Sequence, residues 1–374
     1  MSEPLPDAPP DDFRQGSPEY TAYQSCRTLE ALGSSWGVVV GGLTREDSQT
    51  AMFRFSPQVV ARVLGYALVH SHTVQGKANV AEEILGCNQN GEFLAGLSYI
   101  YVMGMIRVCM SSHPKGSVPT SLSSHSSRAS FQATADNIAA ALAQPTISSS
   151  VAKDLALARD NYRCIVSGAV NFPSFRKDPM RFPEASRVNV AYTSLGHIFG
   201  QLTMDHTTGM TSAARAKLAW ATSAAAVIEW FSGISVVNEL NGNDIHRPEN
   251  TFTIADGLHT AFDQLAFSLR PIGSDDNNTY EIHTYPSGLN ASFRLPDRVM
   301  LTNATNGNIP LPDRRYFQLH DACARIAHLS GAGEVVEQLF RDMEDVKVLA
   351  EDGGSNHLLS LALSSHVQAQ SQCD

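Results

Sequence analysis

Three polar side chains in the middle of the chain have the types that acid–base chemistry needs. His197 follows a short run of alternating apolar residues, Asn250 precedes the β-branched run 251–254, and His259 falls in a helical pattern. An imidazole titrates near neutrality and can act as a base or a ligand, whereas an amide orients other groups without titrating. Brought together, these groups could activate water for attack on a phosphodiester. The competing interpretation of His197 is a core histidine satisfied by backbone groups.

A carboxylate accompanies the second of these histidines. Asp263 follows His259 at i+4, so both side chains lie on one flank of the same short helix. Imidazole and carboxylate groups are both ligands of divalent cations. The sequence therefore predicts a metal site at His259 and Asp263, for Mg²⁺, Mn²⁺, Zn²⁺ or Ni²⁺, with the alternative that Asp263 only braces a turn.

The segments that must position these groups predict an α+β chain that is mostly helical. A serine-rich composition at 111–130 cannot bury a core and is typical of a linker. The insert 200–249 separates His197 from Asn250, either as a lid over the site or as an enlargement of the core. The expected division is an N-terminal segment 1–52, a helical region 53–145 with the linker 111–130, a small mixed core 146–300 with the helical insert 200–249, and a C-terminal helical region 301–374.

Shorter elements follow from the spacing of apolar residues, which alternate in strands and recur every three or four positions in helices. The expected strands are 188–192, 251–254, 266–271, 280–285 and 292–295. The expected helices are those within 56–110 and at 134–144, 257–265, 316–329 and 334–349. His320 and His328, on the first of the two C-terminal helices, are interpreted as structural.

Charge and composition limit the kinds of partner that this chain can bind. The 374 residues are 43% hydrophobic and 17% charged, with a formal net charge of −10. Such a charge is unfavourable for nucleic-acid binding, which depends on Lys and Arg at the phosphates. The stretch 159–200 is nevertheless locally basic, with six cationic residues against three acidic ones. DNA is therefore retained as a candidate partner, with a small-molecule substrate as the alternative.

The N-terminus and the cysteines indicate a compartment. Residues 1–12 are acidic and proline-rich, without the basic start and apolar core of a secretory signal. The apolar run 93–110 contains Ser98 and Arg107 and is shorter than the ~20 residues that a membrane helix needs. Six cysteines without a CxxC pair fit a reducing environment. We expect an intracellular protein of the cytoplasm or nucleus, with no membrane partner.

Three blocks of sequence, taken together, resemble the fungal HNH nuclease-domain proteins, a subgroup of the ββα-metal endonuclease family. The blocks are ARDNYRCIVSG at 158–168, GHIF at 196–199, and the stretch 247–263, which begins RPEN and ends HTAFD. The helical regions on both sides also resemble full-length members of that family. The resemblance implies a small ββα-metal core, here interrupted by the insert 200–249.

The same resemblance implies a role for each polar residue. His197 would be the catalytic general base that takes a proton from water. Asn250 would be the catalytic-site amide that holds the hairpin turn and orients that imidazole through a side-chain hydrogen bond. His259 would bind a divalent metal that stabilises the leaving oxygen of a phosphodiester.

The sequence departs from the family pattern next to the first histidine. Many HNH nucleases carry Asp or His directly before it, and related fungal sequences often carry Glu three positions before it, whereas this chain has Gly196 and Ser194. Three functions therefore stay open. They are a metal-dependent HNH-type endonuclease or a divergent relative, a non-nuclease enzyme of fungal secondary metabolism that reuses the pocket for acid–base chemistry on a small molecule, and a catalytically silent interaction protein.

Overall fold

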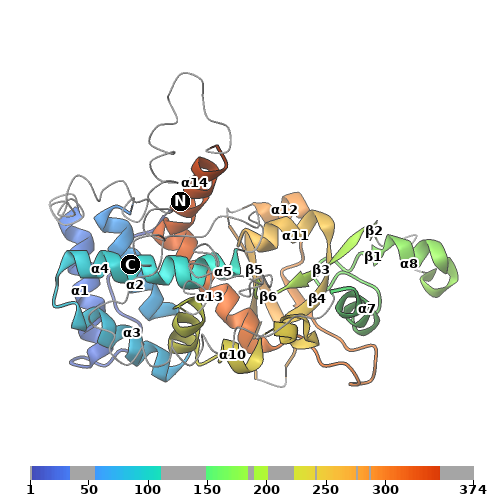
Figure 1. The fold of residues 1–374 in the computed structure, drawn as a ribbon, viewed down its shortest axis with the longest axis horizontal. Helices are drawn as coiled ribbons and strands as arrows, with labels where there is room; N and C mark the ends of the chain where they lie inside the picture. The colour runs from blue at the N-terminus through green and yellow to red at the C-terminus, as the bar shows by residue number, and fades with distance from the viewer. Residues whose placement is uncertain are drawn as a thin grey trace, which may run out of the picture.

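Helices and three small sheets alternate along the chain, which confirms the α+β expectation (Figure 1). The computed structural model describes residues 2–33, 55–110, 149–183, 189–200, 223–240, 242–274, 277–285 and 288–345. The serine-rich stretch 111–130 and the expected helix 134–144 lie outside these ranges. The division into four regions stays a prediction. Among the described residues, a large hydrophobic core includes residues from Leu5 to Val336, and a small second cluster forms around Val170 and Phe182.

The N-terminal region is a layer of helices, as the periodicity over 56–110 predicts. α1 (Pro18–Leu32) and α2 (Pro57–His70) each begin with a proline behind a capping serine, whose hydroxyl accepts a backbone N–H of the first turn. The rest of the layer is α3 (Val74–Gly86), α4 (Gly91–Tyr101), the π-helical turn η4 (Val102–Ile106) and α5 (Arg107–Cys109).

The described part of the insert belongs to the core of this helical layer. Residues 223–232 are helical, and the Phe231 ring meets the edge of Tyr101 with centroids 6.1 Å apart. Asn79 donates a side-chain hydrogen bond of 2.8 Å to the carbonyl of Trp230. A Cβ on Gly104 would lie 3.1 Å from Val227, so glycine allows the two helices to approach closely. Residues 223–232 of the insert therefore enlarge the core.

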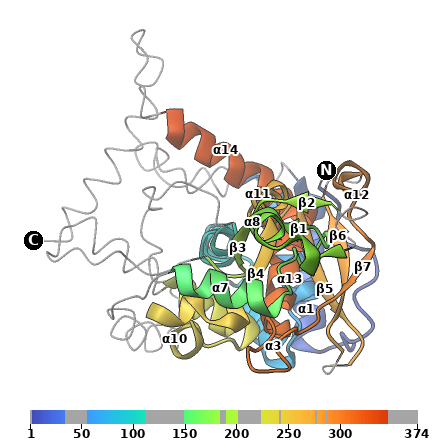
Figure 2. The ribbon, with the colours of Figure 1, turned by 90° about the vertical axis from the view of Figure 1, so that its right-hand side faces the viewer.

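Two strands and a helix form a small unit in the middle of the chain. β3 (Thr193–His197) pairs antiparallel with β4 (Thr251–Ala255), and α11 (Asp256–Asp263) begins at the next residue. Phe252 of β4 packs edge-on against Phe262 of α11, with ring centroids 5.1 Å apart. Figure 2 shows β3, β4 and α11 grouped beside α13.

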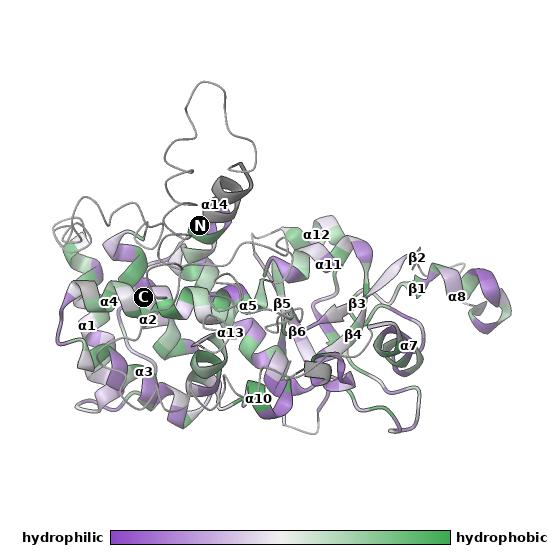
Figure 3. Cartoon of the chain, in the orientation of Figure 1, coloured by the Kyte–Doolittle hydropathy of each residue, from purple (hydrophilic) through white to green (hydrophobic). Residues whose placement is uncertain are grey.

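A short parallel sheet extends from this unit towards one end of the molecule (Figure 1). It consists of β1 (Val170–Asn171) and β2 (Val190–Ala191), followed in space by α8 (Phe172–Lys177) and the turn η5 (Pro179–Arg181). The expected strand 188–192 is thus confirmed only in part, because β2 covers two of its residues. The outer end of this extension is largely hydrophilic (Figure 3).

A three-stranded antiparallel sheet and a long helix complete the fold. The sheet joins β5 (Phe267–Ile272), β6 (Thr279–Thr284) and β7 (Arg298–Met300), and α13 (Arg314–Ser330) packs against β5 and α2. The remaining elements are α7 (Ser149–Arg159), α10 (Val236–Glu239), η7 (Gly242–His246), η8 (Pro248–Asn250), α12 (Leu289–Phe293) and α14 (Ala332–Asp345).

The expected strand 292–295 is wrong. The chain forms α12 there and then closes a left-handed turn at Arg294 (φ 51°), whose N–H donates to the carbonyl of Ala291. The alternating pattern therefore has no neighbouring strand to pair with, and β7 takes the sheet position instead. The expected helix 316–329 is confirmed as α13, and the expected helix 334–349 is confirmed as α14 up to Asp345, since residues 346–349 lie outside the described ranges.

The two histidines of α13 are packed in the core, as expected. The His320 ring lies flat on Phe262, with centroids 4.0 Å apart, and His328 lies flat on Tyr285 at 4.5 Å. No helix in the described part of the chain has the length and apolarity needed to span a membrane.

Candidate active site at the junction of β3, β4 and α11

His197 ends β3 and contacts a histidine that the sequence did not single out. Its Nε2 lies 2.9 Å from Nδ1 of His246, which ends the turn η7, so one of the two nitrogens donates to the other. His246 stands four residues before Asn250. That nearness to a suspected site residue is the signal in the sequence that could have identified it.

Burial favours the uncharged form of both imidazoles. It lowers the pKa of His197 to about 4, and the charges that His246 and His259 would carry lower it further. Burial also lowers the pKa of His246. A neutral ring has one nitrogen lone pair free to accept a proton.

Asn250 is fully buried and ties together the backbone on both sides of the histidine pair. Its Oδ1 accepts the N–H of Phe199 at 3.0 Å, and its Nδ2 donates to the carbonyl of Phe199 at 3.3 Å and of Ile245 at 2.9 Å. Its own carbonyl accepts the N–H of Ile198. These bonds hold the turn, as the resemblance implies, but the partner of the His197 ring is His246. Asn250 acts here as a positioning residue.

A buried ion pair from the first sequence block braces the outer edge of β4. Arg159 and Asp160 are bonded side chain to side chain at 2.7 Å, and the Arg159 side chain is fully buried. Its guanidinium also donates to the carbonyls of Pro248 and Thr251, while Asp160 accepts the N–H of Thr253. The block 158–168 therefore fixes the strand that follows Asn250.

Packing explains why the position before His197 is glycine. A Cβ at Gly196 would lie 2.8 Å from the Phe252 ring and 3.2 Å from Ile254, both on the paired strand β4. An aspartate or histidine there would need this core to move. Ser194 instead donates a hydrogen bond to Asp256 at the start of α11. Side chains alternate along a strand, so Ser194 points to the face opposite His197.

His259 and Asp263 are placed to share a cation. Nε2 of His259 and Oδ2 of Asp263 lie 3.7 Å apart. This separation suits two neighbouring ligands at about 2.0–2.2 Å from one ion. No group of three or more His, Cys, Asp or Glu side chains within the described ranges is placed to hold a metal. The pair therefore suits a cation that keeps water or substrate phosphate at its other positions, as Mg²⁺ commonly does.

The basic stretch 159–200 is divided between core and surface. Arg159 is buried in the brace, whereas Arg176, Lys177 and Arg181 are exposed on α8 and η5, beside Asp178. The Arg181 guanidinium lies over the Tyr162 ring, 4.3 Å from its centroid. Among the described residues of this stretch, the exposed cations therefore gather on the extension at the end of the molecule.

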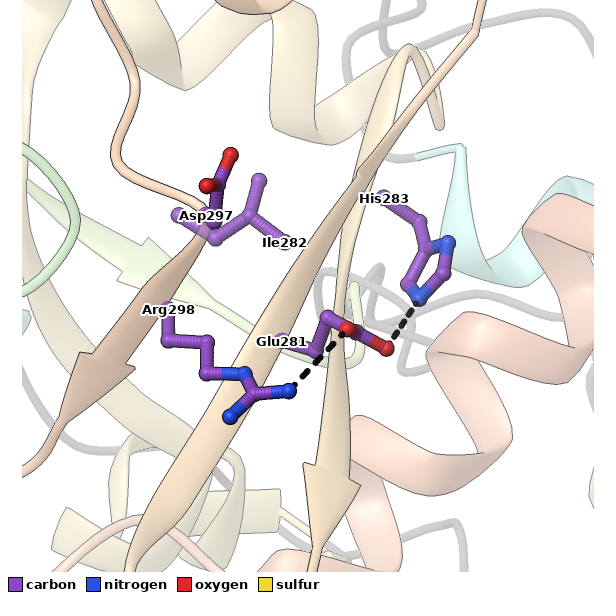
Figure 4. A pocket seen from close by; sticks show the side chains of 5 residues that line it. All are labelled: Glu281, Ile282, His283, Asp297 and Arg298. Atoms are coloured by element: carbon purple, nitrogen blue, oxygen red, sulfur yellow. Dashed lines mark hydrogen bonds and ion pairs between the residues drawn. The ribbon is translucent and has the colours of Figure 1, made fainter.

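A hollow of about 490 Å³ on β6 and β7 offers a different setting for small-molecule chemistry. Glu281 is its central group and lies 3.0 Å from His283 and 3.8 Å from Arg298 (Figure 4). The hydrogen bond from His283 is the main cause that lowers the pKa of Glu281. The carboxylate of Glu281 is therefore already engaged by two neighbouring side chains of the hollow.

Comparisons of this chain with protein-family models, with curated proteins and with solved structures gave no match.

Proposed function

We propose that this chain is an HNH-type endonuclease of the ββα-metal class, in which His197 activates water for hydrolysis of a phosphodiester in DNA. One observation carries the proposal. The antiparallel pair β3–β4 runs directly into α11, with His197 at the end of the first strand, Asn250 just before the second and His259 on the helix. The resembling sequence blocks bring the same residues in the same order.

The proton chemistry follows from the histidine pair. In the tautomer with the proton on Nε2, His197 donates to His246, and the lone pair on Nδ1 is left to accept a proton from water. Asn250 fixes the backbone beside both rings, which limits the loss of orientation during the reaction. A divalent cation held by His259 and Asp263 would supply positive charge for the phosphodiester oxygens.

The extension formed by α8 and η5 supports DNA as the substrate. Arg176, Lys177 and Arg181 are exposed there, and such side chains contribute affinity by neutralising phosphates. They give a chain of net charge −10 a local surface that a polyanion can approach.

Cleavage of supercoiled plasmid by the full chain tests the proposal. The protein is incubated with Mg²⁺, Mn²⁺, Zn²⁺ or Ni²⁺ in turn, and with a chelator. We expect nicking with at least one cation and its loss in His197→Ala. His283→Ala is the matched control, since it removes a half-buried histidine of β6. Absence of cleavage beyond the His197→Ala background with every cation would contradict the proposal.

The paired imidazoles also favour a second candidate, acid–base catalysis on a small molecule without a metal. His197 and His246 bond directly to each other, with glycine where many family members place a carboxylate. This candidate predicts hydrolysis or isomerisation of small substrates that persists in chelator and requires both histidines. Plasmid cleavage that depends on an added cation would count against it.

A further inference from the structure

A second polar hollow, of about 360 Å³, lies where the end of α2 meets β5 and α13. None of its lining residues belongs to the candidate site around His197 and His259. Its ionisable lining residues come from the end of α2 and the turn after it, from α3, from β5 and from α13, and they are His70, His72, Lys77, Arg270, Asp321 and Arg325.

Both carboxylate oxygens of Asp321, the acidic residue in the lining, already accept hydrogen bonds. Oδ1 of Asp321 accepts the Ser268 hydroxyl at 2.6 Å, and Oδ2 accepts Nε of Arg270 at 3.1 Å and Nε of Arg325 at 3.0 Å. Two guanidinium groups thus share one carboxylate, which leaves an excess of one positive charge in this trio. Among the described residues, the terminal nitrogens of Arg325 make no hydrogen bond of their own.

Two ring nitrogens in the lining also lack hydrogen-bond partners. Nε2 of His70 and Nδ1 of His72 are buried and have no hydrogen-bond partner in the described part of the chain. Burial, helped by the charge of Lys77, lowers the pKa of each imidazole to about 4, and Arg270 adds to the effect at His70. A neutral imidazole donates from one of its two ring nitrogens, so each ring can present an N–H at this atom, and protonation makes both nitrogens donors.

We propose that this hollow binds a small oxyanion, the phosphate or carboxylate group of a ligand, between Arg325, Lys77 and the two imidazoles. An anion supplies the acceptors that the lining lacks and the negative charge that its cations favour. A metal cation is disfavoured, because Arg270 and Lys77 would repel it and Asp321 has no oxygen to spare. The proposal stands independently of the nuclease function.

Neighbouring acids only partly neutralise the site. Lys77 pairs with Asp12, which is about half-exposed, and Arg270 lies 4.0 Å from Glu281. Glu281 in turn faces His283 and Arg298 on its other side. A bound oxyanion would add negative charge next to His70 and His72 and raise the pKa of both. Binding should therefore take up protons and tighten as the pH falls.

Titration calorimetry on the full chain tests the site with inorganic phosphate and with citrate, which separate the two sources of the oxyanion. We expect saturable binding of at least one, weakened about tenfold in Arg325→Gln and in Lys77→Gln, because each loses a charged donor. Arg27→Gln is the matched control, since Arg27 lies on α1 outside the hollow and pairs with Asp7, and this variant should bind as the parent does. Lys77→Gln decides the result alone if Arg325→Gln does not fold.

Sulfate is the probe for proton uptake, because its charge is constant between about pH 5 and pH 8. Its dissociation constant should fall by about threefold as the pH is lowered from about 8 to about 5, if the bound anion raises the pKa of each imidazole by about one unit. The double variant His70→Gln/His72→Gln should lose this pH dependence. Absence of saturable binding by phosphate, citrate and sulfate, or equal affinity in the parent, Lys77→Gln and Arg325→Gln, would overturn the proposal.

Discussion

Nε2 of His197 and Nδ1 of His246 lie 2.9 Å apart, although 49 positions separate the residues in the chain. The side-chain amide of Asn250 stabilises this contact through the backbone next to each ring. It donates to the carbonyl of Ile245, the neighbour of His246, and accepts the N–H of Phe199, two residues after His197. One buried side chain thus sets the positions of both rings.

Replacing His246 should impair catalysis through His197. His246→Ala removes the partner of Nε2, so the His197 ring loses its orientation, and we expect the cleavage rate to fall roughly tenfold or more. The loss should appear in kcat with little change in KM, and His246→Asn, which can still accept or donate a hydrogen bond, should recover part of it. Steady-state kinetics of the three proteins measure this. Unchanged kcat in His246→Ala would show that the histidine pair is not used.

Replacing Asn250 should destabilise the fold. Asn250→Ala leaves the N–H of Phe199 and two carbonyls, of Phe199 and Ile245, without their buried partner. Each unsatisfied group costs about 1–3 kcal/mol, so a loss of about 3 kcal/mol or more in unfolding free energy is expected. Denaturant unfolding measures it, with Asn238→Ala as the control at an exposed amide. Equal losses in the two variants would refute the positioning role.

Acid should unfold the protein through its buried histidines. Burial lowers the pKa of His70, His72 and His197 to about 4 and that of His320 to about 3, from 6.5 in the unfolded chain. Protons therefore bind the unfolded chain preferentially. The stability is fully present above pH 6.5 and is lost as the pH falls from 6.5 towards 4.

Unfolding free energies measured between these pH values should fall by up to about 1.4 kcal/mol per pH unit for each such group. His320→Leu removes one group from this sum and should give a shallower slope. A slope identical to that of the parent would mean that His320 is not buried in its neutral form.

The exposed cations of α8 should contribute to DNA affinity. Arg176→Ala/Lys177→Ala removes two side chains that can neutralise phosphates, so binding should weaken on all sequences alike. The slope of log affinity against log salt should become shallower by about two, whereas Arg27→Ala, on α1, should leave it unchanged. Fluorescence anisotropy at several salt concentrations measures both effects. Parent-like binding by the double variant would place the DNA contact elsewhere.

Local patterns were sufficient to predict the second strand and the helix of the unit formed by β3, β4 and α11, whereas β3 begins one residue after the expected strand 188–192. The β-branched run 251–254 became β4, and the apolar stripe that follows became α11. The strand expected at 292–295 failed because pairing depends on a neighbour, and the chain turns back at Arg294 before it reaches β6.

Contacts between distant segments could not be predicted in the same way. His246 meets His197 only because the insert returns to the start of β4, and no local periodicity encodes that path. The glycine at 196 looked like a missing ligand in the sequence, whereas its contact with Phe252 across the sheet gives it a packing reason. The brace of Arg159 on β4 is equally a tertiary feature, invisible in the basic run to which it belongs.

Single-turnover cleavage of a labelled DNA duplex by the full chain tests the central claim most directly. The parent, His197→Ala and His283→Ala are compared with the cation that supports plasmid nicking. His197→Ala should lower the rate by about 10²–10⁴, the usual contribution of a general base, and His283→Ala should leave it within about twofold. Equal rates for the parent and His197→Ala would contradict the account.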